Sequence, residues 1–200
     1  EEMIARWNLS GAYHKQLDRR VRESDVEQSS PRHALGDEAP ERFVVRENGI
    51  AYELSFAEGY SVGLFLDQRE NRRRLLVGHI AADFPIELAG VEMLNAFAYT
   101  CSFSVCAARA GARTTSLDLS KKYLTWGARN LELNGIVPAE HDFIFGDAFD
   151  WLRRLGRKGR RFAVTVLDPP TSSQSKRSGA FRAETDYGKL VTAAAPLLPP

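Results

Sequence analysis

The sequence predicts an α/β fold with a mostly parallel sheet, preceded by a β-hairpin. From residue 91 onward, short apolar runs that suit strands alternate with helical patterns, which is typical of a doubly wound sheet. Earlier in the chain, Asn48-Gly49 lies between two strand-like runs, a strong hairpin signal. The 200 residues, 44% of them hydrophobic, suffice for one sizeable core.

Residues 1–42 form a polar, weakly periodic N-terminal extension. We expect a short helix around Ala12 to Val21, followed by a mobile linker with loop signals at 29–31 and 36–40. Residues 43–90 supply the β-hairpin, with Phe43–Val45 and Ile50–Leu54 as its strands, and a connecting helix.

Residues 91–200 carry the alternating pattern of the main domain. Its strands are expected at Met93–Tyr99, Thr114–Leu117, His141–Phe145 and Phe162–Leu167. Its helices are expected at Phe103–Ala110, from the N-cap Ser120 to Asn134-Gly135, at Phe149–Leu155 and at Asp186–Leu198.

Composition narrows the classes of protein. No apolar run reaches the roughly 18 residues of a membrane span, and Cys101 and Cys106 are the only cysteines, so we expect a cytoplasmic protein with no disulfide and no metal site. The formal net charge is +1, but cations gather in three clusters that could form a local basic face: Lys15, Arg19, Arg20 and Arg22; Arg69, Arg72, Arg73 and Arg74; and Arg153 through Arg161.

Three aspartates follow three of the predicted strands. Asp118 comes after the second strand, Asp147 after the third and Asp168 after the fourth, where an open parallel sheet binds its ligands. A carboxylate after the second strand can accept both hydroxyls of a ribose, and one after the third suits an adenine amino group. The alternative is that each carboxylate merely caps a helix.

The turn after the first strand contains no glycine. A dinucleotide-binding fold would show Gly-x-Gly-x-x-Gly here, so the turn disfavours a nucleotide-dependent oxidoreductase, which is the alternative enzyme class. After the fourth strand, Asp168-Pro169-Pro170 forms a rigid exit that can aim acceptors at a flat base. The polar segment Thr171–Gly179 reads as a loop that contacts phosphates or is merely solvated.

These motifs together resemble 23S ribosomal RNA methyltransferases over about residues 43–200. The resemblance rests on Tyr60–Arg69, Asn95–Ser104, Leu117–Ser120, Asn130–Gly135, and Asp168–Thr171 with Ser175–Arg177. It is strongest to the guanine-N7-methylating half of the bifunctional large-subunit enzyme, with the cytosine-C5 enzymes next. It implies a Rossmann-like class I methyltransferase fold that uses S-adenosyl-L-methionine.

The resemblance assigns roles to residues. The catalytic group would be Asp168, Pro169 and Pro170, and the cofactor would contact Gln68, Arg69, Asn95, Phe97, Tyr99, Thr100, Cys101, Ser102, Asp118 and Asp147. Gln68 and Arg69 would reach either the amino-acid end of the cofactor or the RNA. Two residues depart from the family pattern, Cys101 in place of glycine and Ser172 in place of phenylalanine. Cys101 could crowd the cofactor, and Ser172 could remove a stacking partner for the base.

Chemistry favours guanine N7 as the acceptor, because its lone pair needs no enzyme nucleophile, whereas C5 of cytosine normally needs a cysteine. The alternatives are the cytosine-C5 enzyme, whose cysteine can follow a later strand, and a catalytically silent RNA-binding domain. We expect ribosomal RNA as partner. We also expect a fragment without the fold's C-terminal strands, and self-association through the exposed sheet edge.

Overall fold

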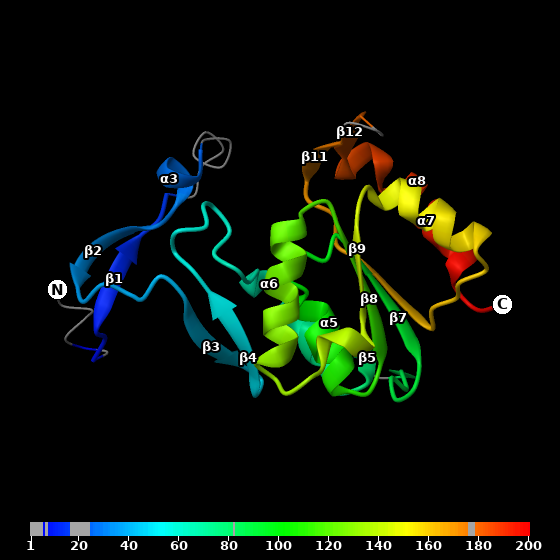
Figure 1. Cartoon of the computed structure of the whole chain (residues 1–200), viewed down its shortest axis with the longest axis horizontal. Helices are drawn as coiled ribbons and strands as arrows, with labels where there is room; N and C mark the ends of the chain where they lie inside the picture. Colours follow the sequence, from blue (N-terminus) through cyan, green and yellow to red (C-terminus); the bar gives the residue numbers. More distant parts are fainter. Residues whose placement is uncertain (1–5, 7, 17–24, 82, 176–178) are drawn as a thin grey trace. The chain divides into compact units, whose positions relative to one another are not determined.

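The protein is described by a computed structural model, which covers residues 6, 8–16, 25–81, 83–175 and 179–200 (Figure 1). The chain forms two compact units, Glu1–Leu66 and Asp67–Pro200. The helix that the sequence grouped with the hairpin, α4 (Arg69–Leu76), therefore belongs to the second unit.

The first unit contains two antiparallel hairpins. One pairs β1 (Gly11–His14) with β2 (Arg32–Gly36), and the short helix α3 (Val26–Ser29) lies between them in the chain. The helix expected around Ala12 to Val21 is thus wrong over its described part, and residues 17–24 lie outside the described residues. Every residue of β2 is exposed, so the sequence has no alternation of apolar and polar residues that would predict this strand.

The second hairpin confirms the prediction. It pairs β3 (Phe43–Glu47) with β4 (Ile50–Leu54). Asn48 and Gly49 connect them with φ of 51° and 82°, the positive values that a tight two-residue hairpin turn requires. The prediction worked because this turn chemistry is local.

The second unit contains a four-stranded parallel sheet. Its strands are β7 (Glu92–Ala96), β8 (Arg113–Asp118), β9 (Asp142–Phe145) and β10 (Val164–Leu167), in the order β10-β7-β8-β9. All four predicted strands are present, with ends shifted by a few residues. Met93 pairs with Thr114 on one side and with Val164 on the other.

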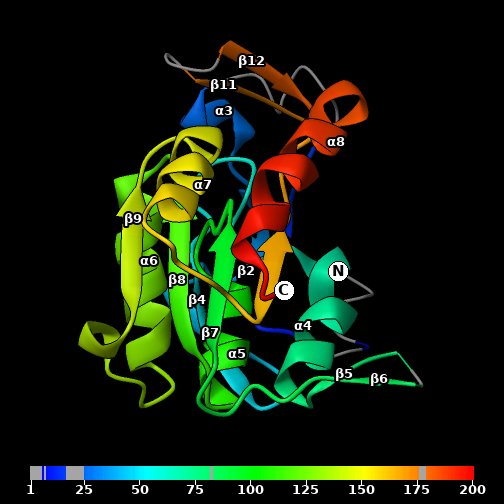
Figure 2. The same ribbon diagram turned by 90° about the vertical axis from the view of Figure 1, so that its right-hand side faces the viewer.

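Helices cover both faces of this sheet. Figure 2 shows α7 (Ala148–Arg157) and α8 (Ala183–Ala194) on one face, and α5 (Ser102–Arg109) and α6 (Lys121–Glu132) on the other. Ser120 caps α6 as predicted, since its side chain accepts from the Tyr123 amide at 3.3 Å. Short elements complete the unit: η1 (Leu66–Gln68), β5 (His79–Ala81), β6 (Phe84–Pro85), η2 (Pro138–Glu140) and η3 (Ala195–Leu197).

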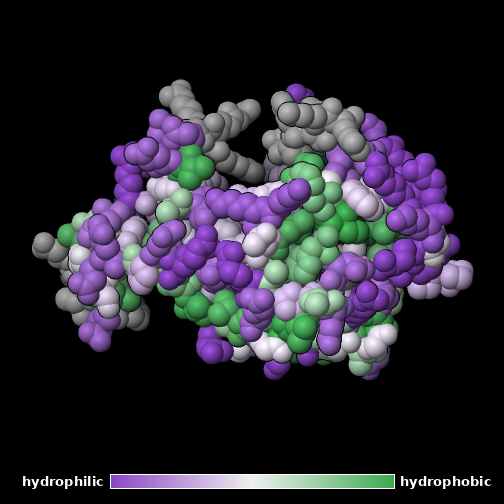
Figure 3. All heavy atoms as spheres, viewed as in Figure 1, coloured by the Kyte–Doolittle hydropathy of each residue, from purple (hydrophilic) through white to green (hydrophobic). Residues whose placement is uncertain are grey.

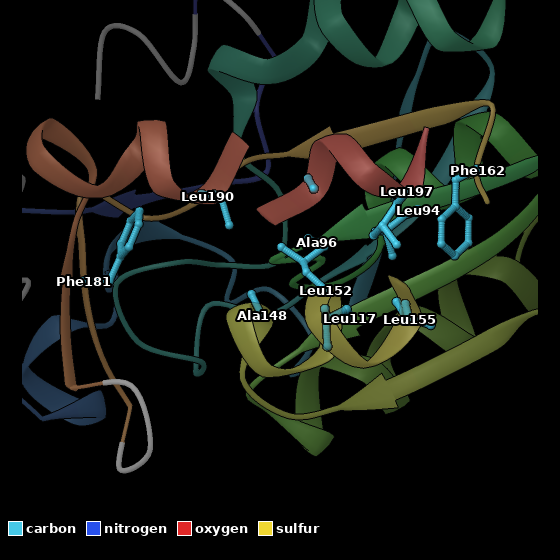
Figure 4. Packing of buried hydrophobic residues seen from close by; sticks show 11 residues of the cluster. Leu94, Ala96, Leu117, Ala148, Leu152, Leu155, Phe162, Phe181, Leu190 and Leu197 are labelled. Carbon is cyan, nitrogen blue, oxygen red and sulfur yellow. The ribbon is translucent and has the colours of Figure 1, made fainter. Parts of the chain in front are cut away.

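The main core lies between the sheet and the helices α7 and α8 (Figure 4). The sheet contributes Leu94, Ala96 and Leu117, which are inaccessible to solvent. The facing residues include Leu152, Leu155, Leu190, Ala194 and Leu197. Each buried leucine contributes roughly 2 kcal/mol. This packing holds the carboxyl ends of the strands in place.

The segment Thr171–Gly179, predicted as a loop, contains a strand. β11 (Ser172–Ser175) pairs antiparallel with β12 (Gly179–Arg182), and residues 176–178 lie outside the described residues. The loop prediction is therefore wrong for the described part. Phe181 of β12 enters the core, with its ring 6.0 Å from that of Phe97, and this anchor lies beyond the polar segment on which the prediction rested.

Candidate functional site

The candidate site lies at the carboxyl edge of the parallel sheet, where the strand order reverses. From β7 the chain continues through α5 to β8 on one side, whereas β10 pairs with β7 on the other side. This switch point is where open α/β sheets bind ligands. The edge carries the turn after Ala96, Asp118 at the end of β8 and Asp168 after β10, as the sequence predicted.

The turn after β7 has an unusual backbone. Phe97, Tyr99 and Cys101 have φ of 61°, 49° and 61°, in the left-handed region that non-glycine residues rarely adopt. The Ala98 amide donates to the Leu117 carbonyl at 3.0 Å, and the Cys101 amide donates to the Ala98 carbonyl at 2.7 Å. Strain of this kind persists where surrounding bonds hold it, and it concentrates at functional sites.

Asp118 ties the turn to the second strand. Its Oδ2 accepts from the Tyr99 amide at 2.8 Å, and its Oδ1 accepts from the Ser120 amide at 2.8 Å. Burial raises the pKa of this carboxyl, and the backbone amides of Tyr99, Ser120 and Leu119 oppose that shift. Each carboxylate oxygen has a second lone pair. The carboxylate therefore keeps acceptor capacity for a hydroxyl group beside its backbone amide donors.

Asp147 is the N-cap of α7. Its Oδ1 accepts from the Asp150 amide at 3.1 Å, and the residue is buried. The helix-capping alternative is thus observed for Asp147, whereas its adenine role stays a prediction. Before it, Gly146 has φ of 156°, and a Cβ at this position would lie 2.3 Å from Nε1 of Trp151. Only glycine lets the Trp151 ring cover this bend.

Asp168 lies beside the start of α4. Gln68 donates from Nε2 to its Oδ1 at 3.3 Å, across 100 positions of sequence. Burial raises the pKa of Asp168, the nearby Asp67 adds to the rise and Arg72 opposes it. Pro169 and Pro170 are half-buried, while Arg69 is exposed.

The other predicted cofactor contacts divide by burial. Tyr99 is half-buried, and its ring lies 4.5 Å from that of Tyr123. Thr100 is buried, and Ser102 is the first residue of α5. Asn95 is buried behind the turn and donates to Ser104 Oγ at 2.9 Å, while its Oδ1 has no hydrogen-bond donor within the described residues.

Cys101 is turned into the core rather than toward the open edge. It has no exposed surface, and a Cβ built on Gly127 would lie 2.2 Å from its Sγ. Burial raises its pKa to about 12, so the group is a neutral thiol. Cys101 and Cys106 are both buried, and neither is in a disulfide. The crowding expected from Cys101 thus falls on α6.

Sequence reasoning missed three supports of the site. Asn130 of α6 donates from Nδ2 to the Thr100 carbonyl at 3.0 Å and so anchors the turn. Leu119 and Phe145, each next to a predicted site residue or bend, leave large apolar surfaces exposed, 42% and 50% of their area. Apolar residues at the carboxyl ends of the predicted strands were the available signal, since Leu119 directly follows β8 and Phe145 is the last residue of β9.

The residues of the three predicted basic clusters differ in their contacts and in their exposure to solvent. Lys15 lies against Tyr60, with its ammonium 4.6 Å from the ring centroid, and it also donates to the Tyr60 carbonyl. Arg72 is buried, so it is not part of a solvent-facing group, because α4 turns it inward. Arg19, Arg20 and Arg22 lie outside the described residues. Arg69 and Arg74 are exposed, as are Arg153, Arg157, Lys158 and Arg161.

Neither a membrane-spanning helix nor a group of metal ligands is present among the described residues. No helix within those ranges is long and apolar enough to cross a membrane. No group of three or more His, Cys, Asp or Glu side chains in the described part of the chain is placed to hold a metal ion.

Comparisons with known proteins identify the family of this chain. Residues 3–200 match a family model described as S-adenosylmethionine-dependent methyltransferase. Ribosomal RNA large subunit methyltransferase K of Neisseria meningitidis serogroup B is 39% identical over 184 residues, which is 91% of this chain and 48% of that protein. Methyltransferase K/L of Methylococcus capsulatus is 40% identical over 159 residues, 78% of this chain and 20% of that protein.

A solved structure shares the fold. It is a methyltransferase complexed with S-adenosylhomocysteine (SAH), with a TM-score of 0.82 and 33% identity. The match covers 98% of this chain and 46% of that one. The chain thus spans about half the length, or less, of the relatives that it matches.

Proposed function

This chain belongs to the S-adenosylmethionine-dependent methyltransferase family, and from that premise we propose that it methylates a base of 23S ribosomal RNA, with guanine N7 as the favoured acceptor. The observation that carries the proposal is the edge of the sheet, where Asp118, Asp168 and the strained turn after β7 meet. The names of its relatives support the RNA substrate, and the glycine-free turn supports the cofactor.

The residues present fit the cofactor. Asp118, held by backbone amides that include those of Tyr99 and Ser120, would accept from the ribose hydroxyls, and Asp147 would accept from the adenine amino group. The exposed apolar surfaces of Leu119 and Phe145 suit a flat base. The turn Phe97–Ser102, with Gln68 and Arg69, would contact the methionine part. When bound, S-adenosylmethionine would supply an electrophilic methyl group on a sulfonium.

Asp168, Pro169 and Pro170 would orient the accepting base. Guanine N7 is already nucleophilic, so the protein needs only to position it and to stabilise the developing positive charge with a carboxylate. The cytosine-C5 alternative needs a reactive thiolate, whereas Cys101 and Cys106 are both buried, and burial raises the pKa of Cys101. Within this chain, the cysteines therefore favour a nitrogen acceptor.

RNA would be engaged through exposed cations on the second unit. Hydrophilic residues predominate over α7 in Figure 3, and Arg153 and Arg157 are exposed there. Such cations contact phosphates without regard to sequence. A base paired in a helix must be extruded before it reaches the sheet edge. A cytoplasmic location follows from this substrate.

The test is methyl transfer from labelled S-adenosylmethionine to 23S RNA, with nucleoside mass spectrometry of the product. We expect 7-methylguanosine with the wild type and none with Asp168→Ala. 5-Methylcytidine would select the alternative enzyme. Binding of SAH and RNA without any transfer, in the full-length protein, would select the silent RNA-binding domain. Retained transfer in Asp168→Ala would remove Asp168 from the mechanism.

Self-association stays a prediction as well. The strands β9 and β10 form the two edges of the sheet, and unpaired edges invite pairing with another chain. We expect sedimentation velocity to show a dimer or larger species that dissociates on dilution. A monomer at all concentrations would contradict this.

A further inference from the structure

One face of α4, together with the residue that precedes this helix, carries a ladder of hydrogen bonds that ends on Asp168. Arg74 donates to Asn71 Oδ1 at 3.4 Å, and Asn71 Nδ2 donates to Gln68 Oε1 at 2.7 Å. Gln68 Nε2 then donates to Asp168 Oδ1 at 3.3 Å. The three α4-side residues are spaced three apart, which places them on the same helix face.

The ladder fixes which end of the Gln68 amide faces Asp168. An amide has an acceptor oxygen at one end and donor hydrogens at the other. Because Asn71 occupies the Gln68 oxygen, the Gln68 NH₂ group is the end that remains for the carboxylate. The opposite orientation would set the Gln68 oxygen against a carboxylate oxygen. Asn71 thereby selects the attractive arrangement although it does not touch Asp168.

Among the described residues, two charged side chains shift the pKa of Asp168. Asp67 on η1 adds a like charge, and the buried Arg72 of α4 adds an opposite one. From α8, the Tyr187 hydroxyl donates to the Leu167 carbonyl at 3.5 Å, one residue before Asp168. Among the described residues, Gln68 supplies the hydrogen bond to the Asp168 carboxyl itself.

We propose that Asn71 is a positioning residue, which acts through the Gln68 amide to set the orientation and environment of the Asp168 carboxyl. The role of Asp168 in methyl transfer rests on the proposed function above. The contact chain from Asn71 to Asp168 does not, so the two claims can be tested separately.

The primary test is an NMR titration of the Asp168 carboxyl carbon in the 200-residue chain, assigned with Asp168→Asn. In Asn71→Asp the new carboxylate can only accept, so Gln68 turns its oxygen toward Asp168. We expect the pKa of Asp168 to rise by about 0.5, the size of a reversed amide dipole plus one partly screened charge. Asn71→Ala, which frees the amide, should give a smaller rise.

The matched control is Arg73→Gln, which changes the net charge on α4 by the same amount but lies outside the ladder, since Arg73 pairs with Glu70 at 2.8 Å. It should move the pKa of Asp168 by less than a third of the effect of Asn71→Asp. Equal shifts in both variants, with unchanged thermal midpoints, would overturn the proposal. A null shift in Asn71→Asp would overturn it too.

Kinetics give the second readout. If the proposed function holds, Asn71→Asp should lower kcat about tenfold, keep the KM for S-adenosylmethionine within about twofold, and move the acid limb of the kcat profile to higher pH. A purely structural role would leave that limb in place. If the wild type transfers no methyl group, the proposed function fails, and the carboxyl titration still decides the role of Asn71.

Discussion

Cys101 and Gly127 share one volume between the strained turn and α6. The cysteine stands in the left-handed region, which glycine tolerates best, and its side chain fills the space that Gly127 leaves open. Added bulk on α6 is excluded, because a Cβ at Gly127 would lie 2.7 Å from the Cys101 Cβ. The departure from the family's usual glycine is thus compensated on the facing helix.

We predict that Gly127→Ala destabilises the protein by about 2 kcal/mol through overpacking. Cys101→Gly should rescue it in the double variant, because the added methyl group then occupies the space of the thiol. Urea unfolding of the four proteins measures the coupling energy. Additive effects of the two substitutions would show that they do not share this space.

At the scale of residues, sequence patterns predicted the positions of only some residues of the candidate site. The positions of Asp118 and Asp168 were predictable because Asp118 ends β8 and Asp168 directly follows β10, and the carboxyl ends of parallel strands lie at one edge of the sheet. The roles of Asn71 and Asn130 were not predictable, because no periodicity marks the hydrogen bonds that Asn71 makes to Gln68 and Asn130 makes to the Thr100 carbonyl.

Two elements, β8 and β9, are joined at their starts by His141. Its Nδ1 accepts from the Thr114 amide at 3.1 Å, so the neutral ring carries its proton on Nε2. Burial lowers the pKa of His141 from 6.5; the positive charge of Arg113 lowers it further, while Glu140 and Asp142 oppose the change. As the pH falls, the unfolded chain therefore takes up this proton before the folded one does.

We predict that this contribution to stability is complete above about pH 6.5 and is lost progressively as the pH falls below it. His141→Asn keeps an acceptor near the Nδ1 position but cannot be protonated. Its urea midpoint should change less between pH 7.5 and pH 5.5 than that of the wild type. Equal changes in both proteins would remove His141 as the cause.

Arg160 joins the amino ends of three strands. Its Nη2 lies 2.7 Å from Glu92, 3.3 Å from Asp142 and 3.3 Å from Thr115 Oγ1. We predict that Arg160→Ala lowers the free energy of unfolding by about 1 kcal/mol, because two half-buried carboxylates lose a shared donor.

The control is Arg153→Ala, which removes a more exposed pair with Asp150 on one helix. Exposed pairs of this kind contribute little, so its effect should stay within about 0.5 kcal/mol. Comparable losses in the two variants by urea unfolding would show that the position at the strand ends gives Arg160 no special weight.

At the scale of elements, the sequence predicted those strands and helices that have apolar residues packed against a core. The strands β7 to β10 and the helices α5 to α8 have apolar residues that face a core, so their periodicity was visible. β1 and β2 have almost no buried face, and β5 and β6 contain only three and two residues, too few for any alternation.

For the whole molecule, the proposed cofactor site predicts ligand-dependent stability. A ligand at about 100 times its Kd adds about 2.7 kcal/mol to the free energy of unfolding. We expect SAH at such an excess to raise the thermal midpoint of unfolding by about 5 to 10 °C, whereas NAD should leave it unchanged. No shift with SAH in a folded protein, or an equal shift with NAD, would contradict the site.

The strand order also sets a sequence of events during synthesis. Met93 pairs with Thr114, 21 residues further along, but its other partner, Val164, is 71 residues further along. Closing the longer loop costs more entropy, and the segment that carries Asp168 leaves the ribosome later. A nascent chain would thus pair β7 with β8, which ends in Asp118, before β10 and the Asp168 that follows it can join the sheet. Arrest of translation before residue 168 should therefore give a species that has Asp118, proposed to bind the ribose, but lacks Asp168, proposed to orient the base.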